Sequence, residues 1–225
     1  MRFTTVLFDL DHTLLDSEQS EALAFDHTLR SIGVDEPAQH LATYQQINSA
    51  LWKRVELGEL SPNEVKVIRF EQLLDALSLD GDPEAMGTTY VEGLGNNGEL
   101  YPDALRLLDA CADARLGLVT NGIGAVQRRR LERLDLNRYF QGVAISGEVG
   151  VAKPDPAIFE HLGFGELDPD VTVMIGDSLT SDIAAGHNAS FATVWFNPHG
   201  KTATEPAPTA QARSLSELST LVASI

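Results

Sequence analysis

Residues 4–11 of the chain read TTVLFDLD, and this stretch decides the fold. The run Thr4–Leu10 is short, apolar and rich in β-branched and aromatic residues, which is typical of a buried strand. Two acidic residues, Asp9 and Asp11, stand at its end. Ligands of open parallel sheets bind beyond the carboxyl ends of the strands, so this acidic pair marks the start of a candidate site.

The pattern of apolar residues changes after this strand. Between residues 17 and 94 the spacing is helical, and we expect helices at 18–32, 37–57, 62–79 and 83–94. Beyond Gly95 strands alternate with helices: strands are expected at 116–120, 142–146, 171–175 and 191–196, and helices at 102–114, 125–134, 156–162 and 181–188. We expect a loop over 197–212 and a closing helix over 214–224, capped by Ser214 or Ser216.

Strands that alternate with helices predict βαβ units around a parallel sheet. We therefore expect an α/β protein whose core is a doubly wound, Rossmann-like parallel sheet built from residues 1–16 and 95–225. An all-helical cap domain, residues 17–94, is inserted after the first strand. The length of 225 residues suits one core with such an insertion.

The composition excludes several classes of partner. The chain has 16 Lys and Arg against 33 Asp and Glu, a formal net charge of −17, which opposes binding to nucleic acid polymers and anionic membranes. No apolar stretch approaches the ~18 residues that a membrane span needs. The single cysteine, Cys111, cannot form an intrachain disulfide, so we expect a reduced, cytoplasmic setting. A small phosphorylated ligand is still allowed, because a local site can differ in sign from the whole chain.

Polar residues follow several of the expected strands. Asp9 and Asp11 follow the first strand, Thr120-Asn121-Gly122 ends the second, and Asp177 follows the strand at 171–175. Lys153 precedes a helix on the same edge of the sheet. Asp9 and Asp177, with Asp182 nearby, form an acidic cluster that needs a cation, and hard oxygen ligands favour Mg²⁺ over Zn²⁺.

These residue types suit phosphoryl chemistry. Lys153 can neutralise a phosphoryl group, the Thr120 hydroxyl can bind it, and the turn at Asn121-Gly122 offers backbone N–H groups near a helix start. A carboxylate held by a metal and a lysine can serve as a covalent nucleophile. A second carboxyl group two residues further on can protonate the leaving group and then activate water.

Four motifs of the chain together resemble those of the haloacid dehalogenase-like hydrolases. They are FDLDHTL at 8–14, TNG at 120–122, KP at 153–154 and GDSLTSD at 176–182. The resemblance implies that Asp9 is the nucleophile that forms an aspartyl-phosphate and that Asp11 is the general acid and base. It also implies that Thr120 and Lys153 bind the phosphoryl group. The implied Mg²⁺ ligands are Asp9, the Asp11 backbone carbonyl and Asp177, with Asp182 in support.

A narrower resemblance joins the chain to the pyrimidine 5′-nucleotidases. It rests on YQQINSALW at 44–52, GELS at 58–61, ISGEVGVAKP at 145–154 and ATVWFN at 192–197. It implies a pyrimidine nucleoside monophosphate as the substrate. A helical spacing that is typical of core packing is shared by Tyr44, Ile47, Leu51, Trp52 and Val55. Asn48 lies on the same face, and our hypothesis is that Asn48 or Trp52 contacts the base.

Other functions stay open at this point. They are a phosphatase for another small phosphoester, such as phosphoglycolate or a sugar phosphate, a phosphomutase, a 2-haloacid dehalogenase and a non-catalytic phosphate-binding regulator. True dehalogenases generally lack an Asp two residues after the nucleophile, so Asp11 favours phosphoester chemistry. The sequence does not predict an oligomeric state.

Several polar residues have simpler interpretations. Asp182 and Ser178 can serve the start of a helix, and His12 is a turn residue whose backbone N–H we expect to face phosphate. Asn121 can be a turn former or a phosphate contact. The run Arg128-Arg129-Arg130 is expected to form a solvated helix face, and a contact with the cap or the substrate is the alternative.

Overall fold

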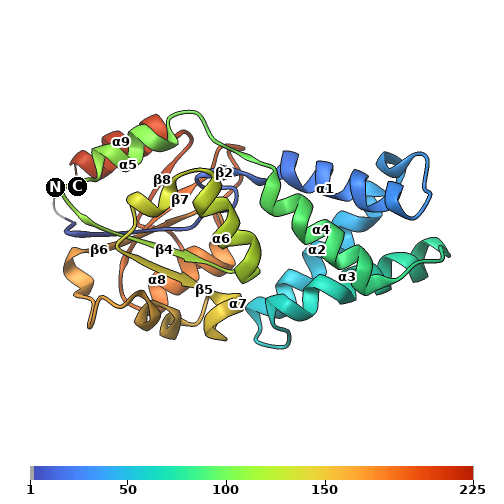
Figure 1. The fold of residues 1–225 in the computed structure, drawn as a ribbon. Helices are drawn as coiled ribbons and strands as arrows, with labels where there is room; N and C mark the ends of the chain where they lie inside the picture. Colours follow the sequence, from blue (N-terminus) through green and yellow to red (C-terminus); the bar gives the residue numbers. More distant parts are fainter. Residues whose placement is uncertain (1–2, 225) are drawn as a thin grey trace.

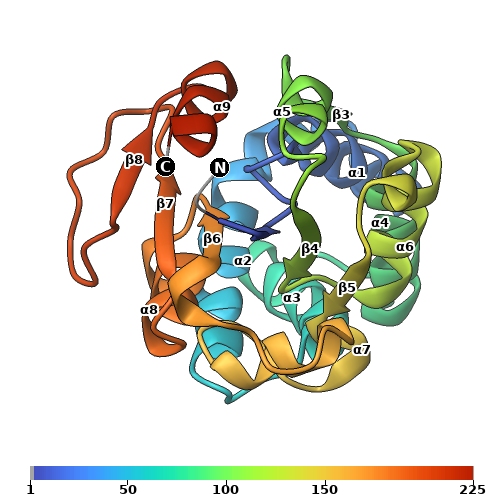
Figure 2. The same ribbon diagram turned by 90° about the vertical axis from the view of Figure 1, so that its left-hand side faces the viewer.

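The computed structural model describes residues 3–224 of the chain. Its main element is a six-stranded sheet in the order β5-β4-β1-β6-β7-β8, in which every pair of neighbours is parallel (Figures 1 and 2). The strands are β1 (Thr5–Phe8), β4 (Arg115–Thr120), β5 (Gly142–Ile145), β6 (Thr172–Gly176), β7 (Ala192–Phe196) and β8 (Ala210–Ala212). The predicted α/β, Rossmann-like fold is therefore confirmed.

The sheet is covered on both faces, which explains why β1 is an unbroken apolar run. Successive side chains of a strand point to opposite faces, so Val6 and Phe8 pack into one apolar cluster and Leu7 into another. The first cluster includes side chains from α5 (Ala104–Ala110), α9 (Leu215–Ser224) and α6 (Gly124–Arg133). The second includes α8 (Ala184–Asn188) and the 3-10 segment Pro156–Leu162.

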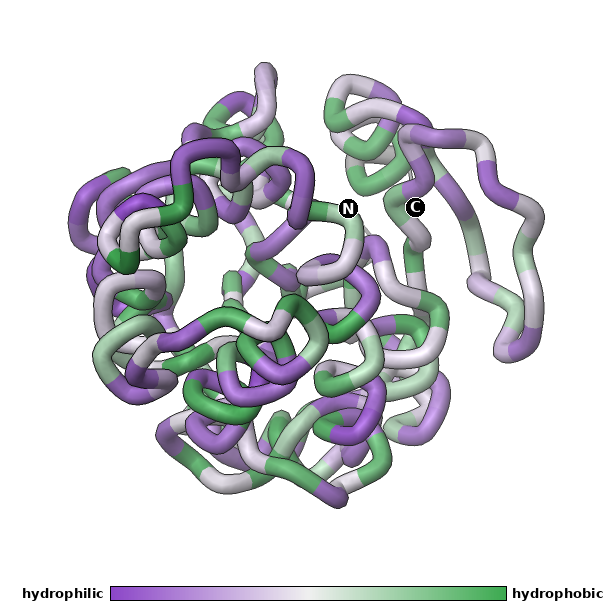
Figure 3. Tube along the Cα trace, turned by 90° about the vertical axis from the view of Figure 1, so that its right-hand side faces the viewer, coloured by the Kyte–Doolittle hydropathy of each residue, from purple (hydrophilic) through white to green (hydrophobic). Residues whose placement is uncertain are grey.

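Four helices form a separate group beside the sheet, which we call the helical lobe (Figure 1). They are α1 (Ser17–Ser31), α2 (Leu41–Glu56), α3 (Pro62–Leu77) and α4 (Pro83–Asn96). Hydrophobic and hydrophilic residues are interspersed along the chain of the lobe (Figure 3). Buried aromatic side chains of the four helices form one cluster, which consists of Phe25, Tyr44, Phe70 and Tyr90. A capping box between Ser61 and Glu64 starts α3, and Asp82 caps α4.

The lobe is joined to the sheet by two chain segments that run side by side. They pair as the short antiparallel strands β2 (Leu15–Asp16) and β3 (Glu99–Leu100). The Arg129 guanidinium donates to the Asn96 side chain at 2.6 Å, which ties α6 of the core to the end of α4. The lobe is thereby held over the carboxyl ends of the strands.

The structure corrects some local expectations. The segment 197–212 is not entirely a loop, because its last residues form β8 at the sheet edge. The helix expected at 37–57 begins as the 3-10 turn Pro37–His40, and that expected at 181–188 begins as the π-helical turn Leu179–Ile183. The Ser214 hydroxyl accepts the Glu217 N–H and so caps α9, as predicted. No helix of residues 3–224 has the length and apolarity that crossing a membrane requires.

Candidate active site

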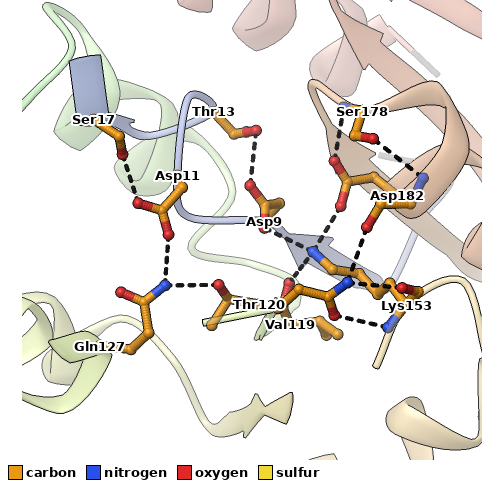
Figure 4. Close-up of polar contacts among 12 residues, drawn as sticks. Asp9, Asp11, Thr13, Ser17, Val119, Thr120, Gln127, Lys153, Ser178 and Asp182 are labelled. Carbon is orange, nitrogen blue, oxygen red and sulfur yellow. Dashed lines mark hydrogen bonds and ion pairs between the residues drawn. The ribbon is translucent and has the colours of Figure 1, made fainter. Parts of the chain in front are cut away.

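Three strand ends place polar side chains at one edge of the sheet. Asp9 follows β1, Thr120 ends β4 and Asp177 follows β6, and β4 and β6 both pair with β1. Lys153 reaches the same place from the loop after α7 (Ser146–Val149), as Figure 4 shows. The four residues line one end of a cavity of about 580 Å³, and side chains of the helical lobe line the other. The structure thus brings together residues that lie far apart in the sequence.

Lys153 is the buried cation of this edge, with 1% of its surface exposed. Its Nζ donates to Asp9 Oδ1 at 2.7 Å, Asp182 Oδ1 at 2.6 Å and the Val119 carbonyl oxygen at 2.6 Å. Burial acts to lower the pKa of Lys153, but Asp182 and Asp9 outweigh it and raise the pKa above its usual value. The ammonium group is therefore charged and held in a fixed position.

Asp9, Asp177 and Asp182 offer carboxylate oxygens that lie within 4.8 Å of one another. Burial, and then the neighbouring carboxylates, raise the pKa of Asp9 well above its ordinary value, although Lys153 opposes the shift. For the same two reasons the pKa of Asp177 rises to about 8. Such crowding of negative charge is relieved by a cation, and the all-oxygen donor set fits a hard divalent metal ion.

The Asp182 side chain is already engaged by the protein. One oxygen accepts from Lys153, and Oδ2 accepts the Ser178 backbone N–H at 2.9 Å. Asp9 Oδ1 accepts from Lys153, and Oδ2 accepts the Thr13 hydroxyl at 3.2 Å (Figure 4). Asp182 therefore positions Lys153 and the loop after β6.

Asp11 has a different set of partners. Its carboxylate accepts from the Ser17 hydroxyl at 2.5 Å, from Gln127 Nε2 at 2.6 Å and from Arg130 Nη1 at 2.6 Å. Burial acts to raise the pKa of Asp11, but Arg130 and then Ser17 outweigh it and lower the pKa to about 2. The two acids of the first motif thus have opposite environments, because Asp9 faces crowded carboxylates and Asp11 faces a guanidinium.

Sequence reasoning missed Gln127 and Arg130 as partners of Asp11. Arg130 was expected on a solvated face, and this is wrong: the residue is 3% exposed, whereas Arg128 and Arg129 are exposed. Arg130 also donates to the Leu94 carbonyl oxygen at 3.1 Å. The spacing between Gln127 and Arg130 is the signal that could have identified them as partners of Asp11. Residues three apart lie on one face of a helix, here α6.

The Thr120-Asn121-Gly122 turn is held by its neighbours. The Thr120 hydroxyl accepts from Gln127 Nε2 at 2.8 Å. Asn121 accepts the Lys153 backbone N–H and donates to the Lys153 carbonyl oxygen, both at 2.7 Å, so its side chain locks the lysine loop in place. A Cβ atom on Gly122 would lie 2.4 Å from Gln127 Nε2, so a larger residue there would displace the Gln127 side chain that binds Asp11 and Thr120.

The structure decides between the sequence interpretations of two turn residues, His12 and Ser178. His12 lies in a turn with φ of 58°, but its backbone N–H donates to the Leu15 carbonyl oxygen at 2.9 Å and is not free for a phosphate. The Ser178 hydroxyl accepts the Ser181 N–H at 3.2 Å, so it caps the turn after β6, which is the simpler of its two interpretations.

The helical lobe contributes the far wall of the cavity. Asn48 and Trp52 of α2, the two residues suggested by the sequence, both line it. Arg69 of α3 and Tyr90 of α4 line it as well and were not predicted. Tyr44, Leu51 and Val55 are buried in the lobe, as their helical spacing indicated.

Comparisons with known proteins agree with this geometry. The chain is 36% identical to the pyrimidine 5′-nucleotidase PynA of Streptococcus pneumoniae, over 97% of this chain and 94% of that protein. It is 33% identical to the pyrimidine 5′-nucleotidase YjjG of Escherichia coli, over 99% of each chain. The crystal structure of the HAD-hydrolase YfnB from Bacillus subtilis, bound to magnesium, matches all of both chains with a TM-score of 0.90 and 31% identity.

A family model assigns residues 3–190 to the haloacid dehalogenase-like hydrolases. That span runs from just before β1 to the loop before β7 and contains all four motifs of the candidate site. The family, the fold and the enzyme class expected from the motifs are confirmed. The chain belongs to the haloacid dehalogenase-like hydrolase family.

Proposed function

We propose that this hydrolase is a Mg²⁺-dependent phosphatase that acts through a phosphorylated Asp9 and prefers pyrimidine nucleoside monophosphates. The observation that carries the proposal is the buried Lys153–Asp9 ion pair of 2.7 Å at the end of a cavity of about 580 Å³. A cavity of this size lies within the range of roughly 300–1,000 Å³ that small-molecule sites occupy. The two pyrimidine 5′-nucleotidases, at 36% and 33% identity, support the choice of substrate.

Asp9, Asp177 and the Asp11 backbone carbonyl would hold the Mg²⁺ ion. When bound, it supplies positive charge that offsets the carboxylates and the phosphoryl oxygens. Asp182 does not need to bind it directly, because both oxygens of Asp182 serve Lys153 and Ser178. The magnesium-bound structure of the YfnB hydrolase supports this choice of metal.

In the first step a carboxylate oxygen of Asp9 attacks the phosphorus atom, and the bond from phosphorus to the ester oxygen breaks. Lys153 and Thr120 bind the phosphoryl oxygens, and their own hydrogen bonds keep them in place before the substrate arrives. Asp11 is ionised while it pairs with Arg130, so it must leave that contact and take up a proton as the substrate binds. It then donates this proton to the leaving alkoxide, which departs as the nucleoside alcohol.

In the second step water attacks the phosphorus atom of the aspartyl-phosphate. Asp11, now ionised, takes the proton from this water, and the bond between Asp9 and phosphorus breaks to release inorganic phosphate. The helical lobe, 17–94, acts as a cap that covers the cavity during transfer and reduces the access of bulk water. The paired strands β2 and β3 carry the two chain connections between the lobe and the sheet, and we place the bend of a closing motion there.

A substrate panel tests the proposal. Release of inorganic phosphate is measured with Mg²⁺ for UMP, dTMP, CMP, AMP, ribose 5-phosphate and phosphoglycolate. We expect the highest kcat/KM for the pyrimidine nucleotides. Asp9→Asn removes the nucleophile with little change in shape, so turnover should fall at least about a thousandfold on every substrate.

Asp113→Asn is the matched control, because Asp113 is exposed and does not line the cavity. It should retain the activity of the natural chain. A preference for ribose 5-phosphate or phosphoglycolate would contradict the substrate assignment alone. Substantial Mg²⁺-dependent turnover by Asp9→Asn would contradict the mechanism.

A further inference from the structure

Arg69 is a buried cation in the lobe wall of the active-site cavity, and the mechanism above does not use it. It lies on α3 with 1% of its surface exposed and lines the same cavity as Asp9 and Lys153. Among the residues that the structure describes, no carboxylate lies within ion-pair distance of its guanidinium. A buried charge without such a partner is unfavourable unless hydrogen bonds or a ligand compensate for it.

The hydrogen bonds of Arg69 hold the side chain but leave part of it free. Nε donates to the Val65 carbonyl oxygen at 3.0 Å, and Nη1 donates to the Tyr44 hydroxyl at 3.1 Å. The guanidinium carbon lies 5.0 Å from the Tyr90 ring centre and 6.0 Å from that of Trp52. Within residues 3–224, Nη2 has no hydrogen-bonding partner. The group is therefore fixed in orientation with one N–H pair available.

Asn48, on the neighbouring helix α2, also has a buried polar atom without a hydrogen-bonding partner in the described part of the chain. It is 8% exposed, lines the cavity, and its Oδ1 has no partner in the described part of the chain. A guanidinium can only donate hydrogen bonds, whereas an amide both donates and accepts. The wall thus presents a donor from α3 and a donor–acceptor pair from α2, which is the pattern that complements the polar edge of a nucleobase.

The charges of the lobe wall argue against a second phosphate as the occupant. Glu21 lines the cavity with Arg69 and lies close enough to act on its charge. Glu18, Glu56 and Lys53 line the cavity as well. The surroundings of Arg69 are therefore not positive overall. A neutral group with hydrogen-bonding atoms suits them better than another anion, and Trp52 adds an aromatic surface on which a flat ring can stack.

Resting on the nucleotidase function proposed above, we propose that Arg69 is the residue that determines base specificity. Its Nη2 donates to a carbonyl oxygen of the base while Asp9 receives the phosphate at the other end of the cavity. The Asn48 amide pairs with the ring N–H or ring nitrogen beside that carbonyl group. A base with an amino group at the same position would present a donor to a donor and would bind more weakly.

The test compares two substrates that differ by the base alone, UMP and ribose 5-phosphate. Arg69→Met removes the donor, and we expect kcat/KM for UMP to fall at least about tenfold, mainly through KM, because a charged hydrogen bond is lost. Ribose 5-phosphate should change by less than about twofold, because no base contact is removed. Arg69→Lys keeps a shorter donor and should give an intermediate loss. Lys66→Met is the matched control, because it removes a charge from the same helix outside the cavity, and it should change neither substrate.

Every outcome of this comparison either supports or overturns the proposed role of Arg69. Unfolding in urea shows whether Arg69→Met still folds, and Arg69→Lys carries the comparison if it does not. An equal loss on both substrates, or no loss on UMP, would overturn the role of Arg69 while leaving the nucleotidase function intact. If the natural chain does not favour UMP over ribose 5-phosphate, the proposed function fails, and the role of Arg69 fails with it.

Discussion

The two walls of the active-site cavity are built differently. At the sheet edge the buried polar groups satisfy one another: Lys153 Nζ has three acceptors, and Asn121 joins both backbone groups of Lys153. In the helical lobe, Arg69 Nη2 and Asn48 Oδ1 are buried without partners among residues 3–224. Both walls line the same cavity.

This contrast separates two tasks of the enzyme. Groups that must stabilise a transition state gain from being oriented before the substrate binds, because no reorganisation is then needed. Groups that recognise a particular substrate gain from having bonds left to form, because the wrong substrate leaves them unsatisfied. We therefore expect changes at the sheet edge to affect all substrates equally and changes in the lobe wall to affect only substrates with a base.

The largest effect is expected from Lys153→Met, which leaves Asp9 and Asp182 buried without their cation. Removing one partner of a buried ion pair costs about 3–5 kcal/mol in the free energy of unfolding, measured in urea. Turnover should be lost for UMP and ribose 5-phosphate alike. Retained turnover on either substrate would break the contrast between the two walls.

A smaller effect is expected from Arg130→Met, which removes the guanidinium that pairs with Asp11. Turnover should fall on both substrates by a similar factor, and the free energy of unfolding at pH 7 should fall by about 1–3 kcal/mol. Arg128→Met is the control, because Arg128 is exposed and pairs with Glu148 at the surface. A loss of turnover on UMP alone would mean that Arg130 acts in base recognition, as we expect for residues of the lobe wall.

The pH dependence of this loss has a definite sign. Asp11 has a folded-state pKa of about 2 against an ordinary value of 3.8. The ion pair therefore stabilises the fold fully above about pH 4 and is lost as the pH falls towards 2. The difference in unfolding free energy between the natural chain and Arg130→Met should shrink between pH 5 and pH 3. A constant difference would show that the other contacts of Arg130 account for the whole effect.

The last effect, on the stability of the fold alone, is expected from the metal itself. Mg²⁺ at 100 times its dissociation constant should stabilise the fold by about 2.7 kcal/mol, seen as a rise in Tm. Asp177→Asn should abolish this rise, whereas Asn48→Ala in the lobe wall should leave it unchanged. Equal Mg²⁺ stabilisation of the natural chain and Asp177→Asn would contradict the placement of the metal at the sheet edge.

Much of the sheet edge could be predicted from the sequence, because its residues stand at the ends of strands. Asp9, Thr120 and Asp177 each follow an apolar run, and strand ends of a parallel sheet meet at one edge. Lys153 could be placed there by its position between a strand and a helix. The local sequence pattern was therefore enough to place the sheet-edge residues of the candidate site.

The partners of these residues could not be predicted in the same way. Arg130 bonds to Asp11 across 119 positions, and Arg69 bonds to Tyr44 across 25, so neither pair leaves a local pattern. The short strand β8 was missed because its three residues, Ala-Gln-Ala, have little strand propensity and are ordered by pairing with β7. These two side-chain pairs and strand β8 depend on tertiary contacts, which a local sequence pattern does not reveal.

The nucleophilic role of Asp9 is the central claim, and trapping the intermediate tests it most directly. A reaction with UMP is quenched in acid during turnover and treated with borohydride, which reduces an aspartyl-phosphate to homoserine. Mass spectrometry of the peptide that contains Asp9 and Asp11 then locates the change. We expect homoserine at position 9 with Asp11 unmodified, and no modification without UMP. Reduction at another carboxylate, or turnover that persists in Asp9→Asn, would contradict the claim.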